Sequence, residues 1–106
     1  MKDLLGMLSK AKEIQGRMQQ MQDELESTEV QGAAGGGMVR VTLTAKGTLK
    51  SLSIDPGLLN PAEGEILEDL VVAAHADART KGERLVKEKM QALTAGLPIP
   101  PGLMPF

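Results

Sequence analysis

Apolar residues recur along the first quarter of the chain at alternating spacings of three and four. They are Leu4, Met7, Ala11, Ile14, Met18, Met21 and Leu25. These positions are the a and d positions of an unbroken heptad repeat, and the residues between them are mostly good helix formers. The pattern predicts an amphipathic helix over residues 3–26, about 36 Å long at ~1.5 Å per residue. A small domain cannot cover so long an apolar seam, so we expect part of it to contact another surface.

The pattern then changes to alternation with a period of two, which predicts three short antiparallel strands. They occupy residues 28–31, 38–44 and 48–54. The glycine-rich run 32–37 is interpreted as a flexible connection, and residues 45–47 as a turn. In the third strand Leu52 and Ile54 share a face and Leu49 is out of phase with them, which indicates a β-bulge or a frayed strand start.

A second long helix is predicted to follow the strands. Asn60, Pro61 and Glu63 match the N-cap, N1 and N3 positions of a helix start, and an apolar stripe begins at Ile66. The stripe thins to alanine, glycine and charged residues between positions 74 and 85, so the helix is expected to leave its core there and project into solvent. The segment 97–106 is Pro-rich and apolar, which predicts a non-helical tail able to dock on another surface.

These elements predict one α+β domain over residues 1–106, in the order α-β-β-β-α. A sheet of three short strands is too small to cover two long helices. We therefore expect a homodimer, built through the strands, the seam of the first helix, or both.

Composition narrows the class of protein. The chain has 106 residues, no Cys and a formal net charge of −2, and it contains a single aromatic residue, Phe106. The absence of Cys excludes disulfides and thiolate chemistry and fits a reducing cytoplasm. The sequence has no run of ~18 apolar residues, so no membrane-spanning helix is predicted. The negative charge and the lack of aromatic residues weigh against nucleic-acid binding by base stacking.

The charge is unevenly distributed along the chain. Residues 40–54 carry three basic side chains and no acid, whereas residues 21–39 carry four acids and residues 55–69 carry five, without a base. Both ends of the chain, residues 1–20 and 70–106, carry two more bases than acids. Local fields are therefore positive on a protein that is acidic overall.

No constellation for catalysis or metal binding is found. The one histidine, His75, has no second ligand four residues on, because position 79 is Arg. The glycine-rich run 32–37 joins two predicted strands, whereas phosphate-binding loops join a strand to a helix. We expect no enzyme, no metal, no cofactor and no small-molecule substrate.

The order of several motifs nevertheless resembles one family, the YbaB/EbfC nucleoid-associated DNA-binding proteins, over essentially the full length. The matching segments are Ile14–Leu25, Val30–Gly32, Met38–Thr42, Ile54–Leu59, Leu67–Ala74 and Leu97–Phe106. This resemblance implies a domain-exchanged, tweezer-like homodimer whose long helices project from a shared sheet core. It also implies binding of duplex DNA without a cofactor and with loose sequence preference, in the nucleoid of the cytoplasm, with effects on nucleoid organisation and gene expression.

The resemblance and the charge pattern together give candidate residues. Basic side chains of the two helices are expected to neutralise DNA phosphates: Lys10, Lys12, Arg17, Arg79, Lys81, Arg84 and Lys87. The heptad positions Leu4 to Leu25 given above are the expected dimerisation residues. A second hypothesis is a protein-interaction adaptor that uses the heptad seam and the Pro-rich tail.

Overall fold

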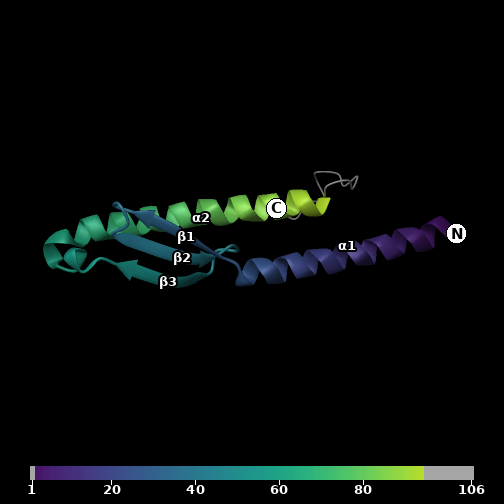
Figure 1. Cartoon of the computed structure of the whole chain (residues 1–106), viewed down its shortest axis with the longest axis horizontal. Coiled ribbons are helices and arrows are strands. Elements are labelled where there is room, and N and C mark those ends of the chain that lie inside the picture. The colour runs from purple at the N-terminus through teal and green to yellow at the C-terminus, as the bar shows by residue number, and fades with distance from the viewer. Residues whose placement is uncertain (1, 95–106) are drawn as a thin grey trace.

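In the computed structural model of the protein, two long helices precede and follow a three-stranded antiparallel sheet along the chain; the second helix lies along the sheet, whereas the first extends away from its end (Figure 1). The structure describes residues 2–94, and the predicted tail 97–106 lies outside them. The elements are α1 (Lys2–Ser27), β1 (Glu29–Ala34), β2 (Val39–Thr44), β3 (Leu49–Ile54), the short 3₁₀ turns η1 (Pro56–Leu58) and η2 (Pro61–Glu63), and α2 (Gly64–Thr94). This order confirms the predicted α+β fold and the α-β-β-β-α arrangement.

The heptad prediction for α1 is confirmed to within one residue at each end. The helix ends where the backbone N–H and the hydroxyl of Thr28 both donate to the carbonyl oxygen of Glu24, at 2.8 and 2.6 Å. These two bonds satisfy a carbonyl that the last turn leaves without a helical partner.

The sheet has the order β1-β2-β3, and its first hairpin differs from the prediction. Gly32, Ala33 and Ala34 were expected in a flexible connection, but they belong to β1 and pair with Val41, Arg40 and Val39. Residues 35–38 form the connection, and its three glycines, Gly35, Gly36 and Gly37, all have positive φ (63°, 68° and 95°). Glycine adopts this left-handed backbone at no steric cost, which places the true turn at those three residues.

The predicted irregularity in the third strand is confirmed as a β-bulge. Thr42 pairs with Ser51 and Leu43 with Leu49, so Lys50 is the additional residue on β3. The strand is an edge of the sheet and its apolar side chains are uncovered, with Leu49 58% and Leu52 46% exposed.

The helix α2 packs across β1 and β2, and it approaches them most closely where the sequence predicted departure from the core. Ala74 and Ala78 are fully buried and Gly82 is also buried. The helix therefore does not leave its core at Ala74, where the departure was expected to begin, but stays packed through Gly82 and projects only from residue 83. Small side chains at spacings of four allow the backbone of α2 to approach the sheet closely here. From the sequence alone, the same residues are interpreted as a weak apolar stripe.

The start of α2 also differs in detail. Asn60 lies before η2, as an N-cap would, but its side chain makes no capping bond and instead donates to the carbonyl oxygen of Gly57 at 3.2 Å. Residues Pro61–Glu63 form a 3₁₀ turn and the α-helix begins at Gly64. The predicted capping box is therefore wrong, although the helix starts within a few residues of the expected place.

Beyond the sheet, the two helices extend from the same end of the molecule as two arms, which are α1 (residues 2–27) and residues 83–94 of α2 (Figure 1). A small apolar cluster of Met21, Leu25, Ala45 and Met90 joins them at their base. The arms give a length of 72 Å and a radius of gyration of 19.6 Å. A compact chain of this size has a radius of about 13 Å.

Candidate nucleic-acid interface

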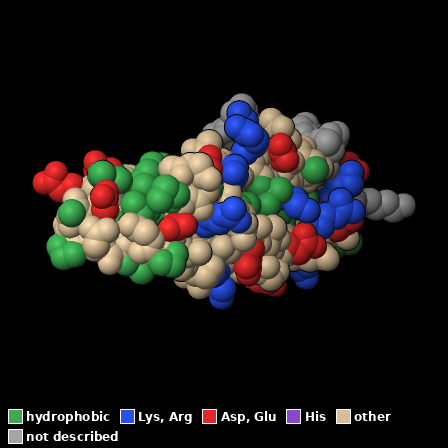
Figure 2. Space-filling view, turned by 60° about the vertical axis from the view of Figure 1, so that its left-hand side comes forward, with side chains coloured by type: hydrophobic (Ala, Val, Ile, Leu, Met, Phe, Trp, Pro, Cys, Tyr) green, Lys and Arg blue, Asp and Glu red, His purple; other side chains and the backbone are tan. Residues whose placement is uncertain are grey.

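The seven basic residues predicted to contact DNA are all exposed, but they occupy two different parts of the molecule. Lys10, Lys12 and Arg17 lie on α1, and Arg84 and Lys87 lie on the arm of α2. Arg79 and Lys81 lie on the part of α2 that covers the sheet. In Figure 2 hydrophobic side chains gather over the sheet end, whereas Lys and Arg side chains gather toward the arms.

Three of these seven cations already have carboxylate partners on their own helix. Arg17 pairs with Glu13 at 2.9 Å, and Arg79 with Glu83 at 3.0 Å. Both pairs are more than half exposed, so each contributes at most about 1 kcal/mol to stability. Such pairs exchange readily, and their cations are less available to a phosphate than an unpaired side chain.

The third, Lys81, holds α2 onto the sheet. Its ammonium group donates to the carbonyl oxygen of Gln31 at 3.0 Å and pairs with Asp77 at 3.2 Å. The carboxylate of Asp77 in turn accepts the backbone N–H of Ala33 at 3.0 Å. Asp77 and Lys81 thus bridge α2 to the edge strand β1, which gives Lys81 a structural role in addition to any contact with DNA.

The remaining four, Lys10, Lys12, Arg84 and Lys87, form no ion pair or hydrogen bond with other residues of the described part of the chain. All four lie on the arms, two on each. A cation that neutralises a DNA phosphate releases the counterions bound to the DNA. An unpaired cation does so without first breaking a contact within the protein. The arms therefore carry the cations that are best prepared for an anionic partner.

The bridge at Asp77 has a consequence for acid stability. The hydrogen bond from Ala33 and the nearby ammonium of Lys81 hold the pKa of Asp77 below its ordinary value of 3.8. A carboxyl whose pKa is lower in the folded than in the unfolded state stabilises the fold, and this stabilisation is complete at pH values above the pKa of the unfolded state. This stabilisation is lost as the pH falls through the folded value.

We expect Asp77→Asn to lower the free energy of unfolding at neutral pH, with a difference from wild type that shrinks below about pH 4. Urea unfolding followed by circular dichroism at several pH values measures this. Glu88→Gln is the matched control, because it removes the same charge from α2 at a residue without a hydrogen bond or ion pair to another described residue. Equal pH profiles for the two variants would contradict the role of Asp77.

The predicted dimerisation residues differ in burial along α1. Met21 and Leu25 are buried inside the protomer, 6% and 1% exposed, against Ala45 and Met90. Ile14 and Met18 are half-buried, whereas Ala11, Met7 and Leu4 are exposed. A partner can reach only the outer part of the seam without opening the cluster at the base of the arms.

Sequence reasoning missed the contacts that hold α2 to the edge strand β1. A spacing of four on one helix identifies Asp77 and Lys81 as a pair, but no sequence signal shows that they bond Ala33 and Gln31, more than forty residues away. Among residues 2–94, no three His, Asp or Glu side chains gather closely enough to bind a metal ion. Neither α1 nor α2 has a stretch apolar enough to span a lipid bilayer.

Comparison with known proteins agrees with the motif pattern. A model of the YbaB/EbfC DNA-binding family matches residues 1–97. Relatives described as nucleoid-associated proteins in Methylocella silvestris and Brucella ovis are 56% and 55% identical over the full length of both chains. The crystal structure of the uncharacterised protein HP0035 from Helicobacter pylori matches with a TM-score of 0.62 and 26% identity, over 74% of this chain and 90% of that one. With a family match over nearly its whole length, and full-length relatives at this identity, the chain belongs to the YbaB/EbfC DNA-binding family.

Proposed function

We propose that this protein is a nucleoid-associated protein that binds duplex DNA as a homodimer and contributes to nucleoid organisation and gene regulation. It acts in the cytoplasm, at the nucleoid, and is not an enzyme. The observation that carries the proposal is the position of the four unpaired cations, Lys10, Lys12, Arg84 and Lys87, on two arms that project from one end of the sheet.

The chemistry of this surface favours contacts with the DNA backbone. Lys and Arg neutralise phosphates irrespective of base sequence. The described residues include no aromatic side chain on which a base could stack, so loose sequence preference is expected. The acidic residues at the start of α2, Glu65, Glu68 and Asp69, lie at the opposite end from the arms and so do not face a duplex held there.

Dimerisation has support from two exposed apolar regions. One is the outer seam of α1, where Leu4 and Met7 are 58% and 67% exposed. The other is the uncovered edge strand β3 with Leu49 and Leu52. An exposed apolar edge strand is a template for pairing with another chain, so a second copy at this edge would bury both its backbone groups and its leucines.

The salt dependence of duplex binding tests the proposed function. Four phosphate contacts, those of one protomer, give a slope of about −3.6 in a plot of log K against log [salt], or roughly a 150-fold loss of affinity between 50 and 200 mM. Contacts from both protomers of the dimer double the slope to about −7.2. A fluorescence anisotropy titration of a labelled duplex measures the slope. No binding at about 50 mM salt, with a stable protein partner co-purifying, would contradict DNA binding and favour the adaptor function.

The mass in solution tests the homodimer. Size-exclusion chromatography with light scattering is expected to give twice the chain mass of 11.2 kDa at micromolar concentration. The double variant Leu49→Ser, Leu52→Ser removes apolar area from β3 and is expected to shift the equilibrium toward monomer. The control Val72→Ser changes a more exposed apolar residue on α2, and equal effects of both variants would exclude β3 as the dimer contact.

A further inference from the structure

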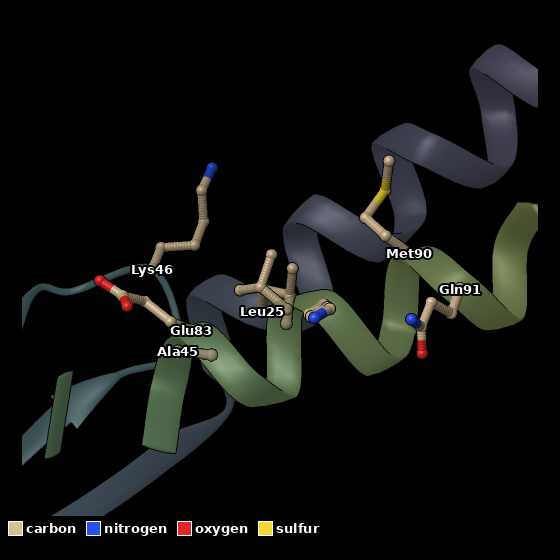
Figure 3. A pocket seen from close by; sticks show the side chains of 8 residues that line it. Leu25, Ala45, Lys46, Glu83, Met90 and Gln91 are labelled. Carbon is tan, nitrogen blue, oxygen red and sulfur yellow. The ribbon is translucent and has the colours of Figure 1, made fainter. Parts of the chain in front are cut away.

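A groove of about 540 Å³ lies between the two arms, at their base (Figure 3). Its floor is apolar and is made by Leu25 of α1, Ala45 of the turn after β2, and Val86 and Met90 of α2. In Figure 3 Lys46 and Glu83 lie at one end of the groove and Met90 and Gln91 at the other, with Leu25 between them. The remaining lining residue, Lys87, stands on the α2 wall.

We infer that this groove binds the Pro-rich segment 97–106 of the same chain. The segment begins three residues after α2 ends at Thr94, one helical turn beyond Gln91. Gly96 precedes it, and glycine just past a helix end permits the chain to reverse direction. The chain therefore emerges beside the groove with the residue needed to turn back into it.

The segment is long enough to fill the groove. From Thr94 back to Glu83, the far end of the groove, is about 16 Å along α2 at ~1.5 Å per residue. Ten residues in the polyproline II conformation that proline favours span about 31 Å. A reversed segment thus passes the whole groove with residues to spare for the turn.

The chemistry of the segment matches the groove. Residues 97–106 carry no charged side chain and contain Leu97, Ile99 and Leu103, which suit the apolar floor. Four of the ten residues are proline, which has a carbonyl acceptor but no N–H donor. The segment is therefore rich in acceptors, and buried carbonyl groups require donors.

The groove supplies such a donor in Lys87. Its ammonium group has three N–H donors and no ion pair with another described residue. Lys46, on the opposite side, is already bonded to Gln22 at 2.8 Å and paired with Glu26 at 3.4 Å. Lys87 is thus the cation of the groove that is available to the carbonyl oxygens of an incoming peptide, and its three donors allow it to contact a DNA phosphate as well.

A helix from a second copy fits the groove less well. A helix about 10 Å wide with a 5.4 Å pitch occupies roughly 400 Å³ per turn, so the groove holds little more than one turn. The segment 97–106, by contrast, is joined to the end of α2 beside the groove, so it reaches the groove without a second chain. In this proposal the segment 97–106 of the same chain occupies the groove, and its presence between the two arms keeps them at a fixed separation.

Paramagnetic relaxation tests this directly on the full chain. The sequence has no cysteine, so Gly102→Cys gives a single attachment site for a nitroxide. The amide signals of Lys46, Val86 and Lys87 are expected to lose most of their intensity, whereas those of Leu4 and Val72 keep theirs. Loss confined to the outer part of α1, or no loss anywhere, would overturn the proposal.

Two further samples serve as controls. The first tests whether the signal loss requires docking in the groove, and the second tests whether the segment comes from the same chain or from another copy. Ile99→Asp with Leu103→Asp in the labelled chain puts carboxylates on the apolar strip without touching residues 2–94, and is expected to restore the signals. Unchanged signal loss in that variant would count against docking in the groove. In a mixture of isotope-labelled chain with nitroxide-labelled, isotope-free chain, the cis site predicts no loss, and a loss at Val86 would show that the segment comes from another copy.

Discussion

Replacing Gly32 by alanine is expected to destabilise the fold by about 3 kcal/mol, the upper end of the usual range for overpacking a well-packed site. A Cβ atom at this position would overlap the carbonyl oxygen of Ala74 and the backbone nitrogen of Ala78, and would lie 2.8 Å from the Cα of Ala78. All three atoms belong to the backbone of α2, so no change of side-chain rotamer relieves the overlap. The helix itself has to move away from β1.

The displaced helix loses more than one contact. Ala33, the next residue on β1, donates to Asp77, and Gln31, the residue before Gly32, accepts from Lys81. The core residues Val39 and Val41, 0% and 1% exposed, lie on the neighbouring strand. At ~4–8 °C per kcal/mol for a domain of this size, Tm is expected to fall by roughly 12–24 °C.

The matched control is Gly16→Ala on α1. A Cβ atom there meets no atom within 4 Å, and alanine is a better helix former than glycine by up to about 1 kcal/mol. The two variants add the same methyl group and are expected to change Tm in opposite directions. Calorimetry at one protein concentration measures both, since Tm depends on concentration if the chain dimerises. A Gly32→Ala variant as stable as wild type would contradict the close approach of α2 to β1.

Gly32 also shows what could be predicted from this sequence and what could not. Periodicity identified both helices, the three strands and an irregularity near Leu49 that proved to be a bulge, because each depends on residues close together in the chain. A glycine in a run of glycine and alanine has the same local signature in a flexible loop and in a strand that touches a helix. Only the position of Ala74 and Ala78, more than forty residues later, distinguishes the two.

The basic surface had the same limitation. Charge counting identified Lys81 and Arg84 as equivalent members of one basic run, since they are three residues apart on one helix. The structure separates them, because Lys81 is bonded to Gln31 of β1 whereas Arg84 has no such partner among the described residues. Which cation remains available to a ligand depends on tertiary contacts, and no count of charges along the chain contains that information.

Because Arg84 is unpaired among the described residues and Lys81 is bonded to β1, a variant at Arg84 is the better test of whether the arms contact DNA. Arg84→Gln with Lys87→Gln removes two unpaired cations from the arm of α2 and breaks no hydrogen bond or ion pair within the described residues. We expect duplex affinity to fall roughly 10-fold or more at about 0.1 M salt, since each cation that neutralises a phosphate contributes counterion release. Substituting Lys81 would be less informative, because the loss of its bond to Gln31 alters the fold as well.

The salt slope then counts the contacts. At about 0.9 per phosphate, the slope is expected to become shallower by roughly 1.8 if one arm of α2 contacts the duplex, and by roughly 3.6 if both protomers of a dimer do. Arg40→Gln with Lys50→Gln is the control, since it removes the same charge from exposed positions on β2 and β3. Within the described residues it breaks one hydrogen bond, the long one of 3.4 Å from Arg40 to the carbonyl oxygen of Gly37. Any general effect of net charge appears equally in both double variants. The arms are the binding surface only if the α2 variant loses affinity and slope beyond the control, and equal losses would place the contact elsewhere on the protein.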